Sequence, residues 1–479
     1  MSGLSDQEVE AIAQRIVAGL ADPPAAPRER AATPSLAGEL GVFETIGEAV
    51  RAAGAAFVEF DQMGLRKRNT IIAAIRNAMR EHRDALAREA HEETGLGRYE
   101  DKIIKNLLVT ENTPGTEDLQ PHAVTGDDGL NLTEPAPYGV IGAITPTTNP
   151  TSTIINNTIA MLAAGNAVVF NVHPNARRVS CHNVALINKA ISGAGGPKNL
   201  ITCIASPTVE SAQALMRHPG VRLLVVTGGG GVVQAAMASG KRAICAGPGN
   251  PPVVVDETAD IEKAARDIVS GASFDNNIIC ADEKECLVVA SVADALIKAM
   301  TYYGAVLVKP EQLPALEKVI FQQNHGPRQE AGIDRSLIGK NASVILRKAG
   351  IACDDSVRLG IVEVDHDHPL LWTEQMMPIL PVTRVRDADE GIDFAIELEH
   401  PRRHTFVMHS QNLSNLSRMA RECDASIFVK NGPSQAGLGW KGEGYTSFTI
   451  ASPTGEGMTS PRSFSRWRRC TLVGGFRIV

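Results

Sequence analysis

Cys280 ends a small, polar, turn-forming segment that begins at Ser273, and an apolar run from Cys286 to Val289 follows it. A thiol reacts as its thiolate, and a loop of Ser and Asn residues can present backbone N–H groups that stabilise the negative charge. Cys286 begins the apolar run and is expected to pack as a small hydrophobic side chain. Cys280 is therefore a candidate nucleophile, although spacing alone leaves a structural cysteine equally open.

Three further loops have compositions typical of functional turns: Thr-Pro-Thr-Thr-Asn-Pro around Asn149, Gly-Pro-Gly-Asn-Pro-Pro from Gly247, and Glu-Gln-Met-Met-Pro from Glu374. Together with the Cys280 loop, their order and spacing resemble the aldehyde dehydrogenase superfamily over about residues 40–479. Within that superfamily the sequence is most similar to the CoA-acylating branch, the propionaldehyde and acetaldehyde dehydrogenases of bacterial microcompartments.

The resemblance implies a role for each loop. Cys280 would attack an aldehyde carbon, while the Asn149 amide and the backbone N–H at Cys280 donate to the developing oxyanion. Glu374 would bond to the nicotinamide ribose. Without the resemblance, Asn149 is a helix cap and Glu374 an exposed loop carboxylate. The other residues implied at the site are Thr145, Pro146, Thr147, His173, Pro174, Thr227, Gly228, Gly229 and Gly247 for the cofactor NAD, with Tyr445 and Phe448 lining the aldehyde pocket.

Ala246 stands where the hydrolytic branch carries the glutamate that activates water. Its methyl group cannot accept a proton, so water has no general base at this position. The thiol of coenzyme A needs less activation and is the expected acyl acceptor. The predicted reaction oxidises a short-chain aldehyde, with propionaldehyde favoured over acetaldehyde, to its acyl-CoA. The alternatives are a hydrolytic or semialdehyde dehydrogenase that releases free acid, a reductase of acyl phosphates, and a non-catalytic scaffold associated with a compartment shell.

Two histidine-containing stretches remain open in part. His173, Pro174 and Asn175 occupy the place where hydrolytic relatives keep Lys-Pro-Ser-Glu, whose Lys and Glu hold the adenosine ribose, so the choice between NAD and NADP is not settled. His400 and His404 precede an expected strand, and we interpret both as structural residues.

The composition excludes several classes of protein. The chain has 479 residues with 43% hydrophobic and 21% charged residues, which is a normal balance for a soluble globular protein of about three domains. A net charge of −7 and few aromatic residues argue against a nucleic-acid partner. No apolar run is long enough for a membrane span, and the eight cysteines show no pairing typical of a metal site. A cytoplasmic protein without a metal is expected.

Strand and helix patterns alternate from Val140 onward, which predicts parallel, doubly wound sheets with ligands at the carboxyl ends of the first sheet's strands. Before this point, helices are expected over 46–60, 65–81 and 83–93. Strands are expected at 140–144, 167–170, 200–204 and 222–226 in the first sheet and at 253–255, 286–289, 305–308, 361–364, 379–385, 405–408 and 427–429 in the second. The resemblance adds an aldehyde dehydrogenase-like α/β fold with two such domains and a small β arm. A cofactor-binding domain is expected over residues 35–120 and 139–250, and a catalytic domain over 251–460. The arm is expected from a hairpin at 121–138, with a Gly-Asp-Asp-Gly turn, and a tail at 461–479. In the family such an arm pairs subunits, so a homodimer or homotetramer is expected.

Residues 5–20 have an apolar helix face with a Ser5–Glu8 capping box, and a linker rich in Pro and Ala follows at 21–34. Such a tethered helix either docks on its own domain or binds a partner. Its resemblance to encapsulation peptides implies that residues 5–20 bind shell or core proteins of a bacterial microcompartment. A membrane-surface helix is disfavoured because the polar face is acidic.

Overall fold

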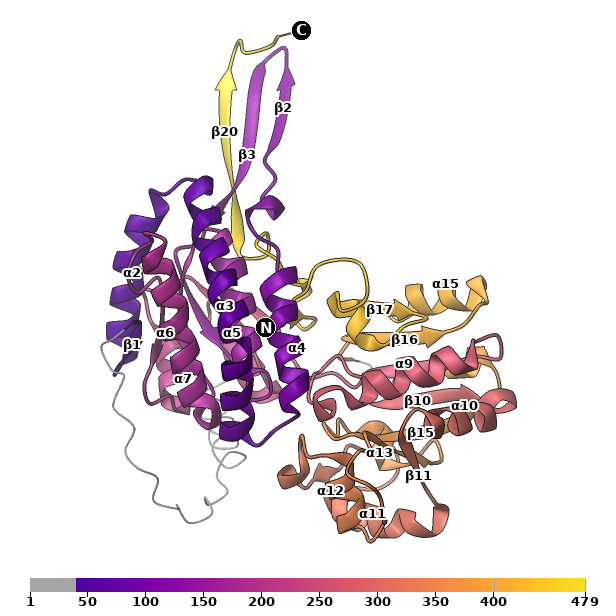
Figure 1. Ribbon diagram of the computed structural model, residues 1–479. Helices are drawn as coiled ribbons and strands as arrows, with labels where there is room; N and C mark the ends of the chain where they lie inside the picture. Colours follow the sequence, from indigo (N-terminus) through magenta and orange to yellow (C-terminus); the bar gives the residue numbers. More distant parts are fainter. Residues whose placement is uncertain (1–39, 400, 479) are drawn as a thin grey trace.

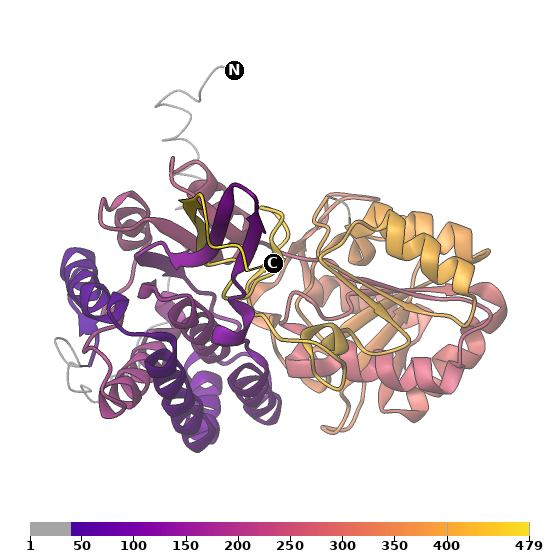
Figure 2. The same ribbon diagram turned by 90° about the horizontal axis from the view of Figure 1, so that it is seen from above.

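The structure is a computed structural model that describes residues 40–399 and 401–478. Two α/β units lie side by side, and a narrow β arm extends from the first unit (Figure 1). The view from above shows the same two units with the arm over the first of them (Figure 2). The expected helix at 5–20, the linker at 21–34 and His400 lie outside the described residues.

The first unit is built on a six-stranded parallel sheet in the order β1-β6-β5-β4-β7-β8. Every residue of β4 and β5 is buried, as expected for parallel strands covered on both faces. Helices α2 and α7 lie against one face of the sheet, and α5 and α6 against the other. The strands are β1 (Val42–Phe43), β4 (Val140–Ile144), β5 (Ala167–Asn171), β6 (Ile201–Ile204), β7 (Leu223–Thr227) and β8 (Ala243–Ala246). The helices are α2 (Ile46–Asp61), α3 (Leu65–Thr94), α4 (Tyr99–Asn112), α5 (Pro150–Ala163), α6 (Arg177–Gly193), α7 (Val209–Arg217) and α8 (Gly230–Met237).

Local sequence signals explain the helix boundaries of this unit. Thr45 and Glu48 form a capping box at the start of α2. Gly95 ends α3 with a positive φ of 66°, a conformation that glycine adopts without a steric penalty. The sequence pattern predicted two helices, over 65–81 and 83–93, but the structure has the single helix α3, because no glycine or proline interrupts the run between them.

The second unit is built on a seven-stranded parallel sheet in the order β11-β14-β15-β10-β9-β16-β17. All seven strands were predicted within one or two residues of their observed ends. They are β9 (Pro252–Val255), β10 (Glu285–Val289), β11 (Ala305–Val308), β14 (Leu359–Glu363), β15 (Ile379–Val385), β16 (Thr405–His409) and β17 (Ile427–Lys430). The helices are α9 (Ile261–Ser273), α10 (Ala290–Tyr302), α11 (Leu313–Ile320), α12 (Ala342–Lys348), α13 (Pro369–Trp372), α14 (Ala388–Glu399) and α15 (Leu413–Glu422).

Side chains of the second sheet alternate between two hydrophobic cores, as the two-residue period of a strand requires. Val253 and Val255 belong to a core that also contains the first unit's strands, whereas Val254 belongs to a core on the opposite face. The first core therefore runs without interruption from one unit into the other. This shared core holds the edges of the two sheets in a fixed relationship.

The arm consists of β2 (His122–Gly126), β3 (Gly129–Pro137) and β20 (Ser465–Val473), paired antiparallel in that order. The predicted hairpin and the predicted strand of the tail are therefore confirmed as structural elements. Two short ribbons were not predicted: β12 (Phe321–Gln323) with β13 (Gly332–Ile333), and β18 (Ile450–Ala451) with β19 (Gly457–Met458). Within residues 40–399 and 401–478, no helix has both the length and the apolar character needed to cross a bilayer.

Candidate active site

Three predicted cofactor segments meet at the carboxyl edge of the first sheet. Strands β5, β4 and β7 are consecutive and parallel, so their ends lie side by side. Thr145, Pro146 and Thr147 follow β4. His173 and Pro174 follow the end of β5 after one intervening residue. Thr227 is the last residue of β7, and Gly228 and Gly229 follow it.

The turn at the end of β7 has the features of a phosphate site. Gly229 precedes α8 as its cap residue without a side-chain hydrogen bond, and a Cβ placed there would meet no atom within 4 Å. The backbone N–H of Gly228 donates to the Ala246 carbonyl at 3.1 Å, which fixes the turn against β8. The buried hydroxyl of Thr145, directly after the neighbouring strand β4, has no protein partner. An open glycine turn at a helix start beside an unpaired hydroxyl fits the phosphates of a dinucleotide.

The predicted nucleophile Cys280 and the predicted ribose ligand Glu374 lie at the amino edge of the second sheet. Cys280 precedes β10, and Glu374 precedes the neighbouring strand β15. His404 immediately precedes β16, and residues 247–251 join the end of β8 directly to the start of β9. The carboxyl edge of the first sheet and the amino edge of the second therefore meet in one place. Ligands usually bind at carboxyl ends, and only the first sheet follows that rule.

Gly249 lies against residues from three loops of the second unit. A Cβ at this position would lie 2.6 Å from the Cys280 carbonyl oxygen and 2.9 Å from Cγ of His404. The backbone N–H of Gly249 also donates to the Glu374 carboxylate. Only a glycine allows this approach, so the Gly-Pro-Gly turn brings Cys280, Glu374 and His404 into contact with one backbone unit.

Burial raises the pKa of the Cys280 thiol, and the negative charge of Glu374 raises it further, to about 12. The positive charge of Lys284 and the backbone N–H of Cys280 act in the opposite direction but are weaker. The sequence pattern predicted a loop that stabilises the thiolate. The structure contradicts this expectation for the free enzyme, because loss of hydration outweighs the donors.

The polar residues before Cys280 serve the loop itself. Asp275, Asn276 and Asn277 all have positive φ values, of 45°, 55° and 64°. The buried ammonium of Lys284 donates to the Asn277 carbonyl at 2.8 Å, to its side-chain oxygen at 2.6 Å and to the Ile279 carbonyl at 3.1 Å. Lys284 therefore clamps a left-handed turn that sets the position of the thiol. Sequence reasoning missed this role.

Asn149 precedes α5 but makes no side-chain capping bond, so the structure gives no support to a capping role. Its Oδ1 accepts a hydrogen bond from Nζ of Lys105 at 2.6 Å, and its Nδ2 donates to Oγ1 of Thr148 at 3.2 Å. Lys105 is buried on α4 and was not singled out from the sequence. The amide thus has a fixed orientation.

The remaining predicted residues differ in burial and in their contacts. Phe448 is buried, and its N–H donates to Oδ1 of Asn156 on α5 at 3.0 Å. Tyr445 is 41% exposed, and its hydroxyl donates to the Met458 carbonyl at 2.7 Å. Gly247 packs against Pro453. His404 is buried, and burial lowers its pKa to about 3, so its ring is neutral.

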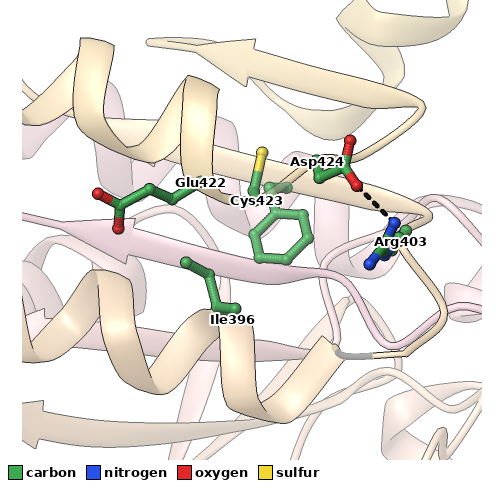
Figure 3. A pocket seen from close by; sticks show the side chains of 6 residues that line it. Ile396, Arg403, Glu422, Cys423 and Asp424 are labelled. Carbon is green, nitrogen blue, oxygen red and sulfur yellow. Dashed lines mark hydrogen bonds and ion pairs between the residues drawn. The ribbon is translucent and has the colours of Figure 1, made fainter.

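A pocket lies on the second unit (Figure 3). It is lined by Ile396, Arg403, Phe406, Glu422, Cys423 and Asp424, and Arg403 pairs with Asp424 there. None of the predicted site residues lines it. In the part of the chain that the structure describes, no group of three or more His, Cys, Asp or Glu side chains is arranged to hold a metal ion.

Comparison with known proteins gives consistent matches. A family model described as the aldehyde dehydrogenase family matches residues 37–445. The acetylating acetaldehyde dehydrogenase of Escherichia coli (strain K12) is 50% identical over 452 residues, which cover 93% of this chain and 96% of that protein. The CoA-propanoylating propanal dehydrogenase of Salmonella typhimurium is 47% identical over 439 residues, 91% of this chain and 93% of that protein. A crystal structure of Rhodopseudomonas palustris propionaldehyde dehydrogenase with bound CoA and an acylated cysteine is 49% identical, has a TM-score of 0.89, and covers 92% of this chain and all of that one.

Proposed function

The chain belongs to the aldehyde dehydrogenase family, and on this premise we propose that it is a CoA-acylating enzyme that oxidises a short-chain aldehyde with NAD. Propionaldehyde is the favoured substrate and acetaldehyde the second, in line with the names of the two relatives. The observation that carries this function is the meeting of Cys280 with the carboxyl edge of the first sheet, at a junction where position 246 holds only a methyl group.

The chemistry of the first half-reaction is assigned to Cys280 and Asn149. The Cys280 thiol releases its proton to solvent, its sulfur adds to the aldehyde carbon, and the carbonyl oxygen becomes an oxyanion that accepts hydrogen bonds from Nδ2 of Asn149 and the Cys280 N–H. Bound NAD would supply the hydride acceptor. Thr145, Thr227, Gly228 and Gly229 would hold the dinucleotide at the carboxyl edge, and Glu374 would hold its ribose. Cys280 is left carrying the acyl group as a thioester.

In the second half-reaction the thiol of CoA attacks the thioester carbon, and the Cys280 sulfur leaves as the new acyl-CoA forms. A thiolate needs less activation than water, so the step proceeds without a base at position 246. Ala246 is buried, and its carbonyl already accepts the Gly228 N–H. Hydrolysis to free acid is therefore disfavoured, and a scaffold without activity would not need the ordered Cys280 loop.

The finer assignments rest on the same function. Residues 35–120 and 139–250 form the cofactor-binding domain, residues 251–460 form the catalytic domain, and the arm pairs subunits into a homodimer or homotetramer. Tyr445 and Phe448 line the aldehyde pocket. Residues 5–20 direct the enzyme into a bacterial microcompartment through shell or core proteins. A reporter fused to residues 1–20 should co-purify with such proteins, and failure to do so would remove the targeting assignment.

The direct test of the proposed chemistry replaces the nucleophile. Cys280→Ala should abolish both NADH formation and acylation of the protein by substrate. Cys286→Ala is the matched control, because this thiol is fully buried in β10, and it should retain activity. Full turnover by Cys280→Ala would overturn every mechanism that passes through a thioacyl enzyme.

A further inference from the structure

One face of α4 carries charged and polar side chains into the protein interior. Asp101, Lys102, Lys105 and Asn106 are all buried. A lysine is almost never fully buried unless its charge is paired, so two of them on one helix face require a specific partner. Helix α4 lies on the side of the first unit that faces the second unit (Figure 1).

The partner is Asp275, in the turn that leads to Cys280. Lys102 Nζ lies 3.1 Å from Oδ2 of Asp275, and the Lys105 ammonium pairs with the same carboxylate. Burial alone would raise the pKa of Asp275, but the two ammonium groups outweigh burial and lower it. The carboxylate also accepts the backbone N–H of Arg98 at 2.6 Å. Asp275 is therefore ionised, and its carboxylate bonds to Arg98 just before α4 and to Lys102 and Lys105 on that helix.

Only Lys105 reaches beyond this carboxylate to the predicted oxyanion donor. Its Nζ donates to Oδ1 of Asn149 at 2.6 Å, whereas no hydrogen bond joins Lys102 to Asn149 among the described residues. An ammonium group has donors and no acceptor, so the amide can turn only its oxygen toward Lys105. The Asn149 NH₂ group must then point away from Lys105, and its one hydrogen bond among the described residues is to Oγ1 of Thr148.

We propose that Lys105 is a positioning residue for aldehyde oxidation, which fixes the Asn149 amide so that its NH₂ group meets the oxyanion. The assignment rests on the proposed function, because an oxyanion develops only when the Cys280 sulfur adds to a carbonyl carbon. If the amide rotated by half a turn, its carbonyl oxygen would face the negative charge and repel it. A cation bonded to the amide oxygen also polarises the amide and strengthens its N–H donors.

Asp275 connects the Lys105–Asn149 pair to the nucleophile Cys280. It lies five residues before Cys280 and belongs to the left-handed turn that presents the thiol. One carboxylate therefore bonds to the residue that orients Asn149 and also holds the start of the Cys280 turn. The two halves of the site, contributed by different units, are positioned relative to each other through the Asp275–Lys105–Asn149 chain.

The test is a double-mutant cycle on NADH formation from propionaldehyde with CoA. Asn149→Ala should lower kcat by ~10²–10³-fold, the loss typical of one oxyanion donor. Lys105→Met, which keeps the volume but removes the donor, should lower kcat by about 10²-fold. In Lys105→Met/Asn149→Ala the rate should fall below that of Asn149→Ala only by the factor that Lys102→Met loses, because the rest of the Lys105 effect passes through the amide.

Lys102→Met is the matched control, since it removes a cation from the same carboxylate without touching Asn149. Its kcat should stay closer to wild type than that of Lys105→Met, and in the Asn149→Ala background it should keep its own factor. If Lys105→Met does not fold, Lys105→Arg enters the same cycle. Arg keeps a donor to the amide oxygen, so its smaller loss should vanish in the Asn149→Ala background.

Two results separate the inference from the function on which it rests. If the wild-type enzyme forms no NADH with aldehyde and CoA, the proposed function fails. If the wild type turns over but the Lys105 variant loses the same factor with and without the Asn149 side chain, the effects multiply and the positioning role is overturned. The rate of Cys280 alkylation in Lys105→Met should equal that in Lys102→Met, because both variants remove one cation from Asp275 and only Lys105 also bonds to the amide.

Discussion

Glu374 and Cys280 lie close enough together for the carboxylate of the first to raise the pKa of the thiol of the second. Gly249 fixes this relationship, because its N–H donates to the carboxylate and its Cα packs against the Cys280 carbonyl. Burial is the larger cause of the raised pKa, and the total effect brings it to about 12. The free enzyme therefore holds its nucleophile as a neutral thiol, with a thiolate fraction of ~10⁻⁴ at pH 8.

This state predicts how the thiol reacts with iodoacetamide as the pH changes. Raising the pH removes the proton, so the alkylation rate of Cys280 should increase about tenfold per pH unit from pH 7 to 10 without a plateau. The rate is followed by mass spectrometry of the peptide that contains Cys280, with the exposed Cys470 as an internal control. A plateau below pH 8 would show that the loop stabilises the thiolate after all.

Removing the neighbouring charge should change the thiol in a defined direction. In Glu374→Gln the pKa of Cys280 should fall, because one of the three causes that raise it is gone, and alkylation at pH 8 should be faster than in wild type. Glu363→Gln is the control, since Glu363 is an exposed partner of Arg384. Equal rates in wild type and Glu374→Gln would mean that the carboxylate does not act on the thiol.

Much of the fold could be predicted because its parallel strands are short apolar runs bounded by turn residues. β4 and β15 have the bounds that the sequence pattern gave. The strand β8 was not identified, because Ala243–Ala246 has only four residues and runs directly into the Gly-Pro-Gly turn. The two predicted helices within 65–93 were wrongly separated, since a local change in polarity is no helix break where no glycine or proline interrupts the run.

The sequence predicted several residues of the site, but it did not predict which charges are buried or the protonation state of the Cys280 thiol. Cys280 was identified because a cysteine is unusual after a polar turn, and the resemblance to the family added Asn149 and the glycine turns. Lys105, Lys284 and Asp275 were not, since a charged residue on a helix or in a turn normally faces solvent. Only the packing of two units shows that these charges are buried and paired. The same packing explains why the donors of the Cys280 loop did not predict the state of the thiol.

Gly249→Ala should separate activity from stability. The new Cβ would lie 2.6 Å from the Cys280 carbonyl and displace the nucleophile, and misplacement by about 1 Å can cost about 10²-fold in kcat. Gly193→Ala is the control, because a Cβ at this position on α6 would meet no atom within 4 Å. Steady-state kinetics and thermal unfolding are measured on both. Normal turnover in Gly249→Ala would contradict the close packing at Cys280.

The arm should be required for subunit association. Val473 in β20 is 80% exposed in the single chain, and Trp467 and Leu472 on the same strand are also exposed. Val473→Lys with Leu472→Lys should therefore shift the enzyme toward monomers in sedimentation velocity, because charges replace apolar contact surface. Leu413→Lys, at a position on α15 that is 72% exposed, is the control and should leave the mass unchanged. An unchanged mass in the arm variant would rule out this surface.

The central claim is tested most directly by NADH formation from propionaldehyde with and without free CoA, with the acyl product identified by mass. The proposed function predicts turnover that depends on CoA and yields propionyl-CoA, because Ala246 offers no base for water. Steady turnover without CoA, with propionate as the product, would contradict it and would mean that another residue at the junction activates water.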